Sequence, residues 1–329
     1  MSSGLHGYLV IDKPAGWTSH DVVGRLRRLL GERKIGHAGT LDPAATGVLP
    51  VAVGDATKTL EYLTEASKTY LAEITFGVET DSYDGDGRVT RVNDASRIEH
   101  GAVCSALLAM EGPQQQLPPM HSAIKIGGKR LYEAARRGED IDRPLRSVSF
   151  HALELVEWVP PVATVFVDCS KGTYVRTLAH DLGRHTGLGA YLSGLIRLRS
   201  GPFSLYDAWT IDELQSISES GCDLIRDQWP VIALHPDVAS AALPVVVLEN
   251  VEAKNWAHGK AIDADGLDVA QVDGVAFRTY DAQGRWIGTG RVDEQSGAWR
   301  PAKVVAPPVD TSSLSVEGSE AGVGEYARG

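Results

Sequence analysis

The sequence is poor in cysteine and contains no long apolar run. Its 3 cysteines, at positions 104, 169 and 222, are far apart, and no two are spaced as CxxC. That pattern argues against a disulfide framework or a zinc site and is typical of a reducing compartment. No run approaches the roughly 20 apolar residues of a membrane helix, and the N-terminus lacks the basic region and cleavage site of a signal peptide. We therefore expect a cytoplasmic protein without membrane contact.

Patterns for metal, phosphate-loop and two-carboxylate chemistry are missing as well. His37 and Asp42 are potential metal ligands, but no third His, Cys, Asp or Glu stands nearby at helical or hairpin spacing. The stretch VGDATKT has only one of the two glycines of a GxxxxGK[ST] loop. A glycosidase needs two carboxylates that flank one bond, and only Asp42 lies in its loop. We expect neither a metal nor a cofactor.

The composition and patterning of the chain indicate a folded protein with two domains. The chain has 329 residues, of which 43% are hydrophobic and 23% charged, as in ordinary globular proteins. Strands and helices are mixed without a repeating βαβ period, which favours an α+β fold. We expect a first domain at residues 1–235, a small β-rich domain at 240–306 and a disordered tail at 307–329.

Charge is unevenly distributed along the chain. A net charge of −11 argues, at face value, against a nucleic-acid partner. Basic residues nevertheless gather in segments 23–36, 120–146 and 171–199. Each cluster alone is consistent with a solvated helix face, but together they allow a basic face on an acidic protein.

Two segments show clear periodicity. Residues 68–77, KTYLAEITFG, alternate as a strand in which Tyr70 shares the inward face with Ile74 and Phe76. Tyr70 is therefore either a core tyrosine or an aromatic platform for a planar ligand. The stretch TSHDVVGRLRRLLG is an amphipathic helix for which Ser19 is the candidate cap.

The run GHAGTLDPAATGV places one carboxylate, Asp42, among very small residues. Asp-Pro followed by AATG is a fair helix start, so helix capping competes with catalysis for Asp42, and spacing alone favours capping. A single carboxylate acts as a nucleophile when a cation keeps it ionised at close range, and the candidate cations are Arg176 and Lys58. Tyr174 lies two residues before Arg176, so both reach one site only if the helix begins around Thr177.

Taken together, these motifs resemble the TruB-type tRNA pseudouridine-55 synthases. The segment KIGHAGTLDPAATGVLPVAVGDATK is similar to that family's central motif nearly throughout. Four further segments resemble the family's other blocks and occur in the same order: IDKPAGWTSHDVV, SKTY, PPMHSAIKIGGKRLYEAARRG and CSKGTYVRTLAHDLG. The similarity spans most of residues 5–210, and residues 240–306 resemble the PUA-like RNA-binding domain that follows in the family.

The resemblance implies a fold and a site. The fold is the pseudouridine synthase fold, a mixed, largely antiparallel sheet flanked by helices. In the site, Asp42 is the catalytic aspartate, Tyr70 stacks on the target base and assists proton transfer, and Arg176 pairs with Asp42. The remaining expected substrate contacts are Tyr174 beside Arg176, Leu195 in the pocket, His37 against the flipped-out nucleotides and the candidate cation Lys58. A Lys13-Pro14 motif is expected to support the Asp42 loop.

The implied activity is the isomerisation of uridine 55 in the T-loop of tRNA to pseudouridine. The small residues around Asp42 would let the sugar of a flipped nucleotide approach the carboxylate, and the three basic segments would line one RNA face. We expect a monomer whose partner is the T-arm of tRNA. The alternatives are a non-catalytic RNA-binding or tRNA-folding factor that uses the same groove and a carboxylate hydrolase acting on a nucleoside. The combination of Asp42, Tyr70 and Arg176 favours the enzyme.

Overall fold

A computed structural model describes residues 4–305 except 121, 123–124, 127–128, 132–136, 138–140, 220–223, 264–266, 268–274 and 294–295. The chain divides into two compact units between residues 242 and 243, whereas the expected first domain ends at residue 235 and the expected second domain begins at residue 240. The tail expected at 307–329 lies outside the described residues.

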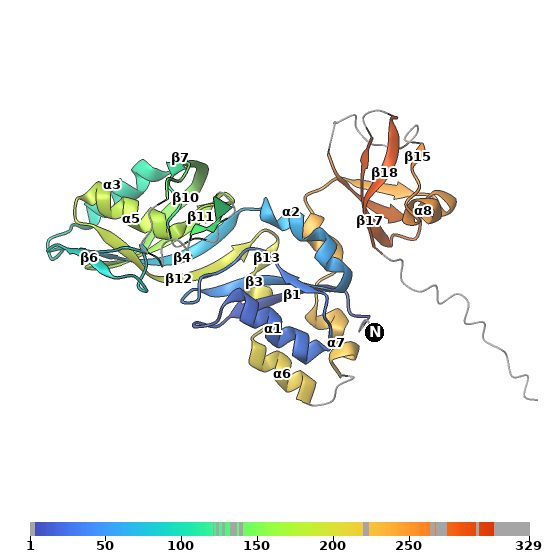
Figure 1. Cartoon of the computed structure of the whole chain (residues 1–329), viewed down its shortest axis with the longest axis horizontal. Helices are drawn as coiled ribbons and strands as arrows, with labels where there is room; N and C mark the ends of the chain where they lie inside the picture. The colour runs from blue at the N-terminus through green and yellow to red at the C-terminus, as the bar shows by residue number, and fades with distance from the viewer. Residues whose placement is uncertain are drawn as a thin grey trace, which may run out of the picture. The chain divides into compact units, whose positions relative to one another are not determined.

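The first unit is built on one large, mixed sheet (Figure 1). All of its strand pairs are antiparallel except the pair of β3 and β12. The expected α+β fold with a largely antiparallel sheet is therefore confirmed. In spatial order the strands are β1 (Gly7–Lys13), β3 (Thr46–Val53), β12 (Ala190–Ser200), β4 (Lys68–Phe76), β11 (Val162–Cys169), β10 (Arg146–Val159) and β7 (Gly112–Gln116), with β2 (Ile35–His37) on β3 and β13 (Phe203–Ser204) on β12.

Helices flank both halves of this sheet (Figure 1). One apolar cluster joins α3 and α5 to β4, β10 and β11, and another joins α1, α6 and α7 to β1 and β3. The helices are α1 (Ser19–Leu30), α2 (Leu60–Thr64), α3 (His100–Met110), α5 (Val175–Thr186), α6 (Ile211–Glu219) and α7 (Leu224–Ile232), with 3-10 turns η1 (Gly54–Thr59), η2 (Leu205–Asp207) and η3 (Pro236–Ser240).

Strand β4 shows why the alternating pattern was informative. Tyr70, Ala72, Ile74 and Phe76 are all buried, as the period of two predicts, while Glu73 is exposed. Tyr70 therefore enters the core cluster beneath α3 and α5, on the face of the sheet where these helices pack.

Strand β12 joins the two halves of the sheet. It pairs in parallel with β3 at Thr46 and Gly47 and antiparallel with β4 along most of its length. Because β3 follows the Asp42 loop and β4 carries Tyr70, β12 brings these two segments together. Its residue Arg197 is directly opposite both Gly47 and Tyr70.

No helix in the described part of the chain is long and apolar enough to span a membrane.

Two small hairpins of the first unit and the whole second unit complete the fold. The second unit is β-rich, as expected, and its apolar core contains the fully buried Trp256 and Trp299. The hairpins of the first unit are β5 (Val78–Thr80) with β6 (Val89–Val92) and β8 (Lys125–Ile126) with β9 (Lys129–Arg130), and the second unit comprises β14 (Val245–Leu248), α8 (Asn250–Ala257), β15 (Ile262–Asp263), β16 (Phe277–Asp281), β17 (Trp286–Val292) and β18 (Ala298–Val304).

Candidate active site

The Asp42 loop is fastened at the residues on both sides of the carboxylate. On one side, the Ser19 hydroxyl accepts a hydrogen bond from the Leu41 N–H at 3.0 Å and donates to the Leu41 carbonyl at 3.4 Å. On the other side, the Lys13 ammonium donates to the Pro43 carbonyl at 3.1 Å. The Lys13-Pro14 motif thus contacts the loop at Pro43. Because both neighbours are held, the backbone of Asp42 has little freedom to move.

Two expectations for local helix starts are wrong. Residues 43–44 form a turn, closed by the hydrogen bond from the Ala45 N–H to the Asp42 carbonyl at 3.1 Å, and a strand follows. Asp42 therefore does not cap a helix. Helix α1 is capped by Thr18, in a reciprocal capping box with Asp21, and not by Ser19. Ser19 is instead buried, where it holds Leu41.

The glycine at the end of the loop makes room for the protein's own backbone. Gly47 has a φ of +94°, and a Cβ atom on it would lie 2.3 Å from the Arg197 carbonyl oxygen of β12. The Arg197 side chain, only 2% exposed, donates to the Val48 carbonyl at 2.6 Å and to the Gly39 carbonyl at 3.0 Å. The expectation that the small residues serve the approach of a nucleotide is thus wrong for Gly47, which allows β12 to pack under the loop.

Replacing Gly47 by alanine is expected to lower the free energy of unfolding by about 3 kcal/mol or more, since strained backbone and overpacking add. The matched control is Gly31→Ala, at a glycine with φ +61° and open space around its Cβ position, where only the backbone cost of about 1 kcal/mol applies. Urea unfolding of both variants measures the difference. Equal losses would show that β12 does not restrict this position.

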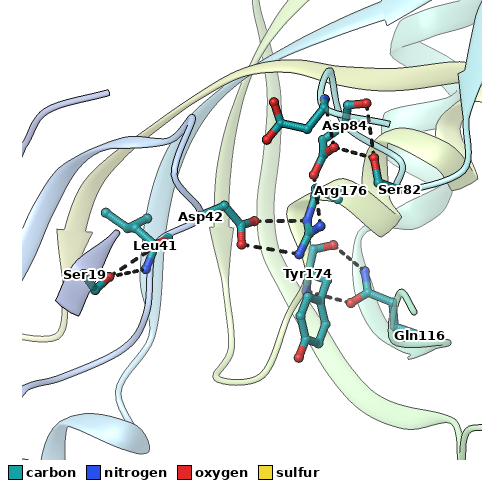
Figure 2. Close-up of polar contacts among 9 residues, drawn as sticks. Ser19, Leu41, Asp42, Ser82, Asp84, Gln116, Tyr174 and Arg176 are labelled. Carbon is teal, nitrogen blue, oxygen red and sulfur yellow. Dashed lines mark hydrogen bonds and ion pairs between the residues drawn. The ribbon is translucent and has the colours of Figure 1, made fainter. Parts of the chain in front are cut away.

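Arg176 connects two carboxylates (Figure 2). Its guanidinium holds Asp42 with two contacts, Nε to Oδ2 at 3.0 Å and Nη2 to Oδ1 at 3.4 Å, and its Nη1 lies 2.9 Å from Oδ2 of Asp84. Arg176 itself is only 6% exposed. A planar guanidinium that is bound at both edges has little freedom to rotate, so it fixes the direction of the Asp42 carboxylate.

The start of α5 aims Arg176 and Tyr174 into the same space. Tyr174 is extended, with φ −102° and ψ 109°, and the helix begins at Val175. The expected extended segment is present, but the helix starts two residues earlier than Thr177. Arg176 therefore leaves the first helical turn, while Tyr174 leaves the residue before it, and Figure 2 shows both near Asp42.

These side chains surround a cavity of about 280 Å³. A cavity of this size lies near the lower end for ligand pockets, which span about 300–1,000 Å³. Of the seven site residues predicted from the sequence, the structure brings five to this cavity and leaves His37 and Lys58 off its wall. The lining residues are Thr40, Leu41, Asp42, Tyr70, Ser122, Thr173, Tyr174, Val175, Arg176 and Leu195.

Tyr70 forms part of the cavity wall and is only 8% exposed. Burial raises the pKa of its hydroxyl, and the nearby guanidinium of Arg197, with which it hydrogen-bonds, opposes this rise. The ring is therefore neutral at ordinary pH and presents an apolar surface beside a carboxylate. That combination suits a planar, polar ring such as a nucleobase.

The pKa of Asp42 is raised above its usual range. Burial is the main cause, the Arg176 guanidinium lowers the pKa, and the negative charges of Asp84 and Asp86 raise it further. Burial therefore outweighs the effect of the cation. Since 44% of the Asp42 side chain is still exposed, the carboxylate is only partly buried and remains accessible to a ligand.

His37 and Lys58 lie elsewhere. His37 ends β2, and its ring meets that of His20 edge-on, with centroids 5.4 Å apart. Burial lowers the pKa of His37, and His20 and Arg197 lower it further, so the ring is neutral at ordinary pH. The Lys58 ammonium lies 3.1 Å from Asp55, in the first turn of η1. Their expected contacts with substrate stay predictions.

Segment 171–199 offers fewer exposed cations to the expected basic RNA face than its sequence suggests. In segment 171–199, Arg176 and Arg197 are buried, and Arg199 is half-buried and paired with Asp168 at 3.1 Å. Lys171 and Arg184 of this segment are exposed. Burial withdraws two guanidinium groups from any phosphate contact, because they serve the cavity and its loop instead.

The most informative residue that sequence reasoning missed is Asp84. In the sequence it belongs to TDSYDGDG, which reads as an acidic turn. In the structure the Tyr83 carbonyl accepts from the Leu192 N–H of β12 at 2.9 Å, and the Tyr83 ring stacks on His180 of α5 at 4.0 Å. These contacts carry Asp84 to Arg176, and nothing in the spacing of the acidic residues distinguishes it from its neighbours.

The first unit thus contains a carboxylate and a guanidinium beside an aromatic wall, in a cavity of about 280 Å³. Among the described residues, no group of three or more His, Cys, Asp or Glu side chains is placed to hold a metal ion. The arrangement defines a site in which one oriented, partly buried carboxylate faces a planar ligand.

Comparison with known proteins gives the family. A model described as the TruB family pseudouridylate synthase N-terminal domain matches residues 27–175. Two further models match residues 176–226, as the tRNA pseudouridylate synthase B C-terminal domain, and 244–305, as the C-terminal region of pseudouridine synthase II TruB. The chain belongs to the TruB family of pseudouridylate synthases.

Curated relatives and solved structures agree with this assignment. A protein of Dehalococcoides mccartyi named tRNA pseudouridine synthase B is 39% identical over 91% of this chain and 96% of its own length. A protein of the same name from Symbiobacterium thermophilum is 55% identical over 65% of this chain and 72% of its own. A chain in the crystal structure of a Cbf5-Nop10-Gar1 complex is 26% identical with a TM-score of 0.73, covering 92% of this chain and 85% of that one.

Proposed function

We propose that this protein isomerises uridine to pseudouridine in tRNA, at uridine 55 of the T-loop, with Asp42 as the catalytic carboxylate. Membership of the TruB family supports the reaction, and the name shared by the curated relatives supports tRNA as the substrate. The observation that carries the proposal is the Asp42 carboxylate, which lines the cavity while Arg176 grips both of its oxygens.

The reaction needs little more than this site contains. It breaks the bond between C1′ and N1, turns the uracil and joins C1′ to C5, so that C5 loses a proton and N1 gains one. No external group or electron is consumed. Asp42 acts either by attacking the sugar or the base, or by abstracting a sugar proton. Arg176 directs the carboxylate, and its positive charge favours the ionised form.

The other residues of the cavity wall bind the base. We assign stacking on the flipped uracil and assistance to proton transfer to Tyr70, and packing against the nucleotide to Tyr174 and Leu195. A base inside a folded arm must leave its stack to reach Asp42. The expected partner is therefore the T-arm of tRNA, bound by a monomeric enzyme in the cytoplasm, with His37 and Lys58 as outer contacts.

A T-arm hairpin provides the direct test. The purified protein is expected to form pseudouridine at the position of uridine 55 in such a hairpin, which a pseudouridine-specific chemical label detects. The control is a hairpin in which cytidine replaces this uridine. Failure with both the hairpin and full-length tRNA would overturn the proposal.

The hairpin and full-length tRNA also distinguish the proposed enzyme from the rival function, a non-catalytic RNA-binding factor. Tight binding of tRNA without any pseudouridine would identify a non-catalytic RNA-binding factor. Modification of full-length tRNA alone would show that contacts beyond the T-arm are essential to the enzyme.

A further inference from the structure

Gln116, the last residue of β7, makes an unusual contact with the active-site segment. Its side-chain amide donates from Nε2 to the Tyr174 carbonyl at 3.0 Å, and its Oε1 accepts from the Tyr174 N–H at 2.8 Å (Figure 2). Gln116 is only 3% exposed. A single side chain therefore satisfies both backbone groups of the residue that precedes α5, as a neighbouring β-strand would.

This contact fixes the geometry of the helix start. The Tyr174 carbonyl also accepts the first helical hydrogen bond, from Leu178 N–H at 3.1 Å. Gln116 thus holds Tyr174 extended while its carbonyl begins the helix, and the Tyr174 ring and the first turn of α5 are directed together. The next residue of the chain adds a second link, because the Leu117 carbonyl accepts from Thr177 Oγ1 at 3.4 Å.

The consequence reaches the reacting carboxylate through Arg176. Arg176 lies two residues after Tyr174 and divides its guanidinium between Asp42 and Asp84, at 3.0 Å and 2.9 Å. A small rotation of the first turn would lengthen one of these contacts and shorten the other. Catalysis is sensitive to such shifts, since a misplacement of about 1 Å costs roughly a hundredfold in rate.

We propose that Gln116 is a positioning residue for the chemical step, which holds Tyr174 and, through the first turn of α5, sets where Arg176 places the Asp42 carboxylate. This inference rests on the proposed function. It predicts that loss of the Gln116 amide lowers kcat and leaves KM for the T-arm hairpin nearly unchanged, because Gln116 does not itself line the cavity and RNA affinity comes largely from phosphate contacts.

Strand β7 contains a matched control. Gln114 has the same side chain on the same face of the strand, and its amide donates to the Met110 carbonyl at 3.1 Å. Gln114→Ala removes a comparable side-chain contact without touching α5. We expect Gln116→Ala to lower kcat by about tenfold or more, with KM within about threefold, and Gln114→Ala to keep both values of the native enzyme.

Gln116→Glu offers a test that separates positioning from folding. A protonated carboxyl group has one donor and one acceptor, like the amide, and fits both backbone groups of Tyr174. An ionised carboxylate has acceptors only and faces the Tyr174 carbonyl. Burial raises the pKa of such a carboxyl group, so it is protonated at low pH and becomes ionised as pH rises. The ratio of the kcat of Gln116→Glu to that of the native enzyme at the same pH should therefore be near one at low pH and fall at least tenfold as pH rises.

The measurement is kcat and KM for the hairpin between about pH 5 and 9, with thermal melting of each variant at the same pH. The inference stands if the relative kcat of Gln116→Glu falls with pH while the variant remains folded at the assay temperature. It is overturned if that ratio is independent of pH, or if Gln116→Ala keeps its kcat within about twofold. Inactivity of the native enzyme would instead contradict the proposed function.

Discussion

Asp42→Asn is expected to lower the rate of pseudouridine formation by at least about a thousandfold. Asparagine has nearly the same shape and keeps an oxygen for Arg176, but an amide neither attacks carbon as a carboxylate does nor accepts a proton. The dissociation constant for the T-arm hairpin should change by less than about threefold, since RNA affinity comes largely from phosphate contacts. Single-turnover labelling and filter binding measure the two quantities.

The matched control for this variant is Asp55→Asn. Asp55 is also a paired aspartate of the first unit, with Lys34 at 2.7 Å and Lys58 at 3.1 Å, but it is not among the residues that line the cavity. Its replacement should leave the rate of pseudouridine formation close to that of the native enzyme. Modification of the hairpin by Asp42→Asn at a comparable rate would remove Asp42 from the catalytic role.

Arg176→Ala is expected to lower the rate by roughly a hundredfold to a thousandfold and to move its pH dependence in a defined direction. In the proposed reaction Asp42 acts in its ionised form, so activity is expected to fall on the acid side as pH drops through the pKa of this carboxyl group. That pKa is already raised by burial, and Arg176 opposes the rise. Without the guanidinium the pKa rises further, so the acid limb of kcat/KM should shift to higher pH.

Asp84→Asn should shift the same limb to lower pH. The negative charge of Asp84 raises the pKa of Asp42, and its carboxylate also holds one edge of Arg176. Arg184→Ala, at an exposed arginine of the same helix, is the control that loses a charge without touching either carboxylate. Profiles of kcat/KM against pH for the three variants measure the shifts. An acid limb that does not move in Arg176→Ala would contradict the pairing.

The parts of the site that the sequence predicted are those set by local pattern. The alternation of residues 68–77 placed Tyr70 on the inward face, because a strand has a fixed period of two. The spacing of Tyr174 and Arg176 predicted an extended segment followed by a helix from about Thr177; Tyr174 is extended, but the helix already begins at Val175. Both features depend on residues that are close together in the sequence, so the local pattern of side chains is enough to predict them.

The parts that the sequence missed depend on pairings between distant segments. Gln116 meets Tyr174 because β7 and α5 are brought together by the fold, and Asp84 meets Arg176 because its loop rests on β12. Arg197 appeared to be one of several surface cations, yet it lies buried beneath the Asp42 loop. Polar spacing gives no sign of such contacts, since each residue type also occurs on solvated faces.

The direction in which the pKa of Asp42 is shifted could not be predicted from the local sequence either, because two effects on it oppose each other. A nearby cation lowers the pKa of a carboxyl group, and Arg176 does act in that direction on Asp42. Burial acts in the opposite direction and is stronger. Which of the two effects dominates depends on the packing of the loop, which the sequence alone does not show.

The parallel pairing of β12 with β3 has a consequence for how the enzyme reaches its working state. It joins Thr46 to Ile196 and Gly47 to Arg197, residues separated by about 150 positions of chain. Contacts of such long range form late, after the entropy of a large loop has been lost. An N-terminal fragment that ends before residue 190 contains Asp42, Tyr70 and Arg176 but lacks the strand that assembles them. During synthesis and refolding, catalytic competence should therefore appear only after β12 has paired with β3 and β4.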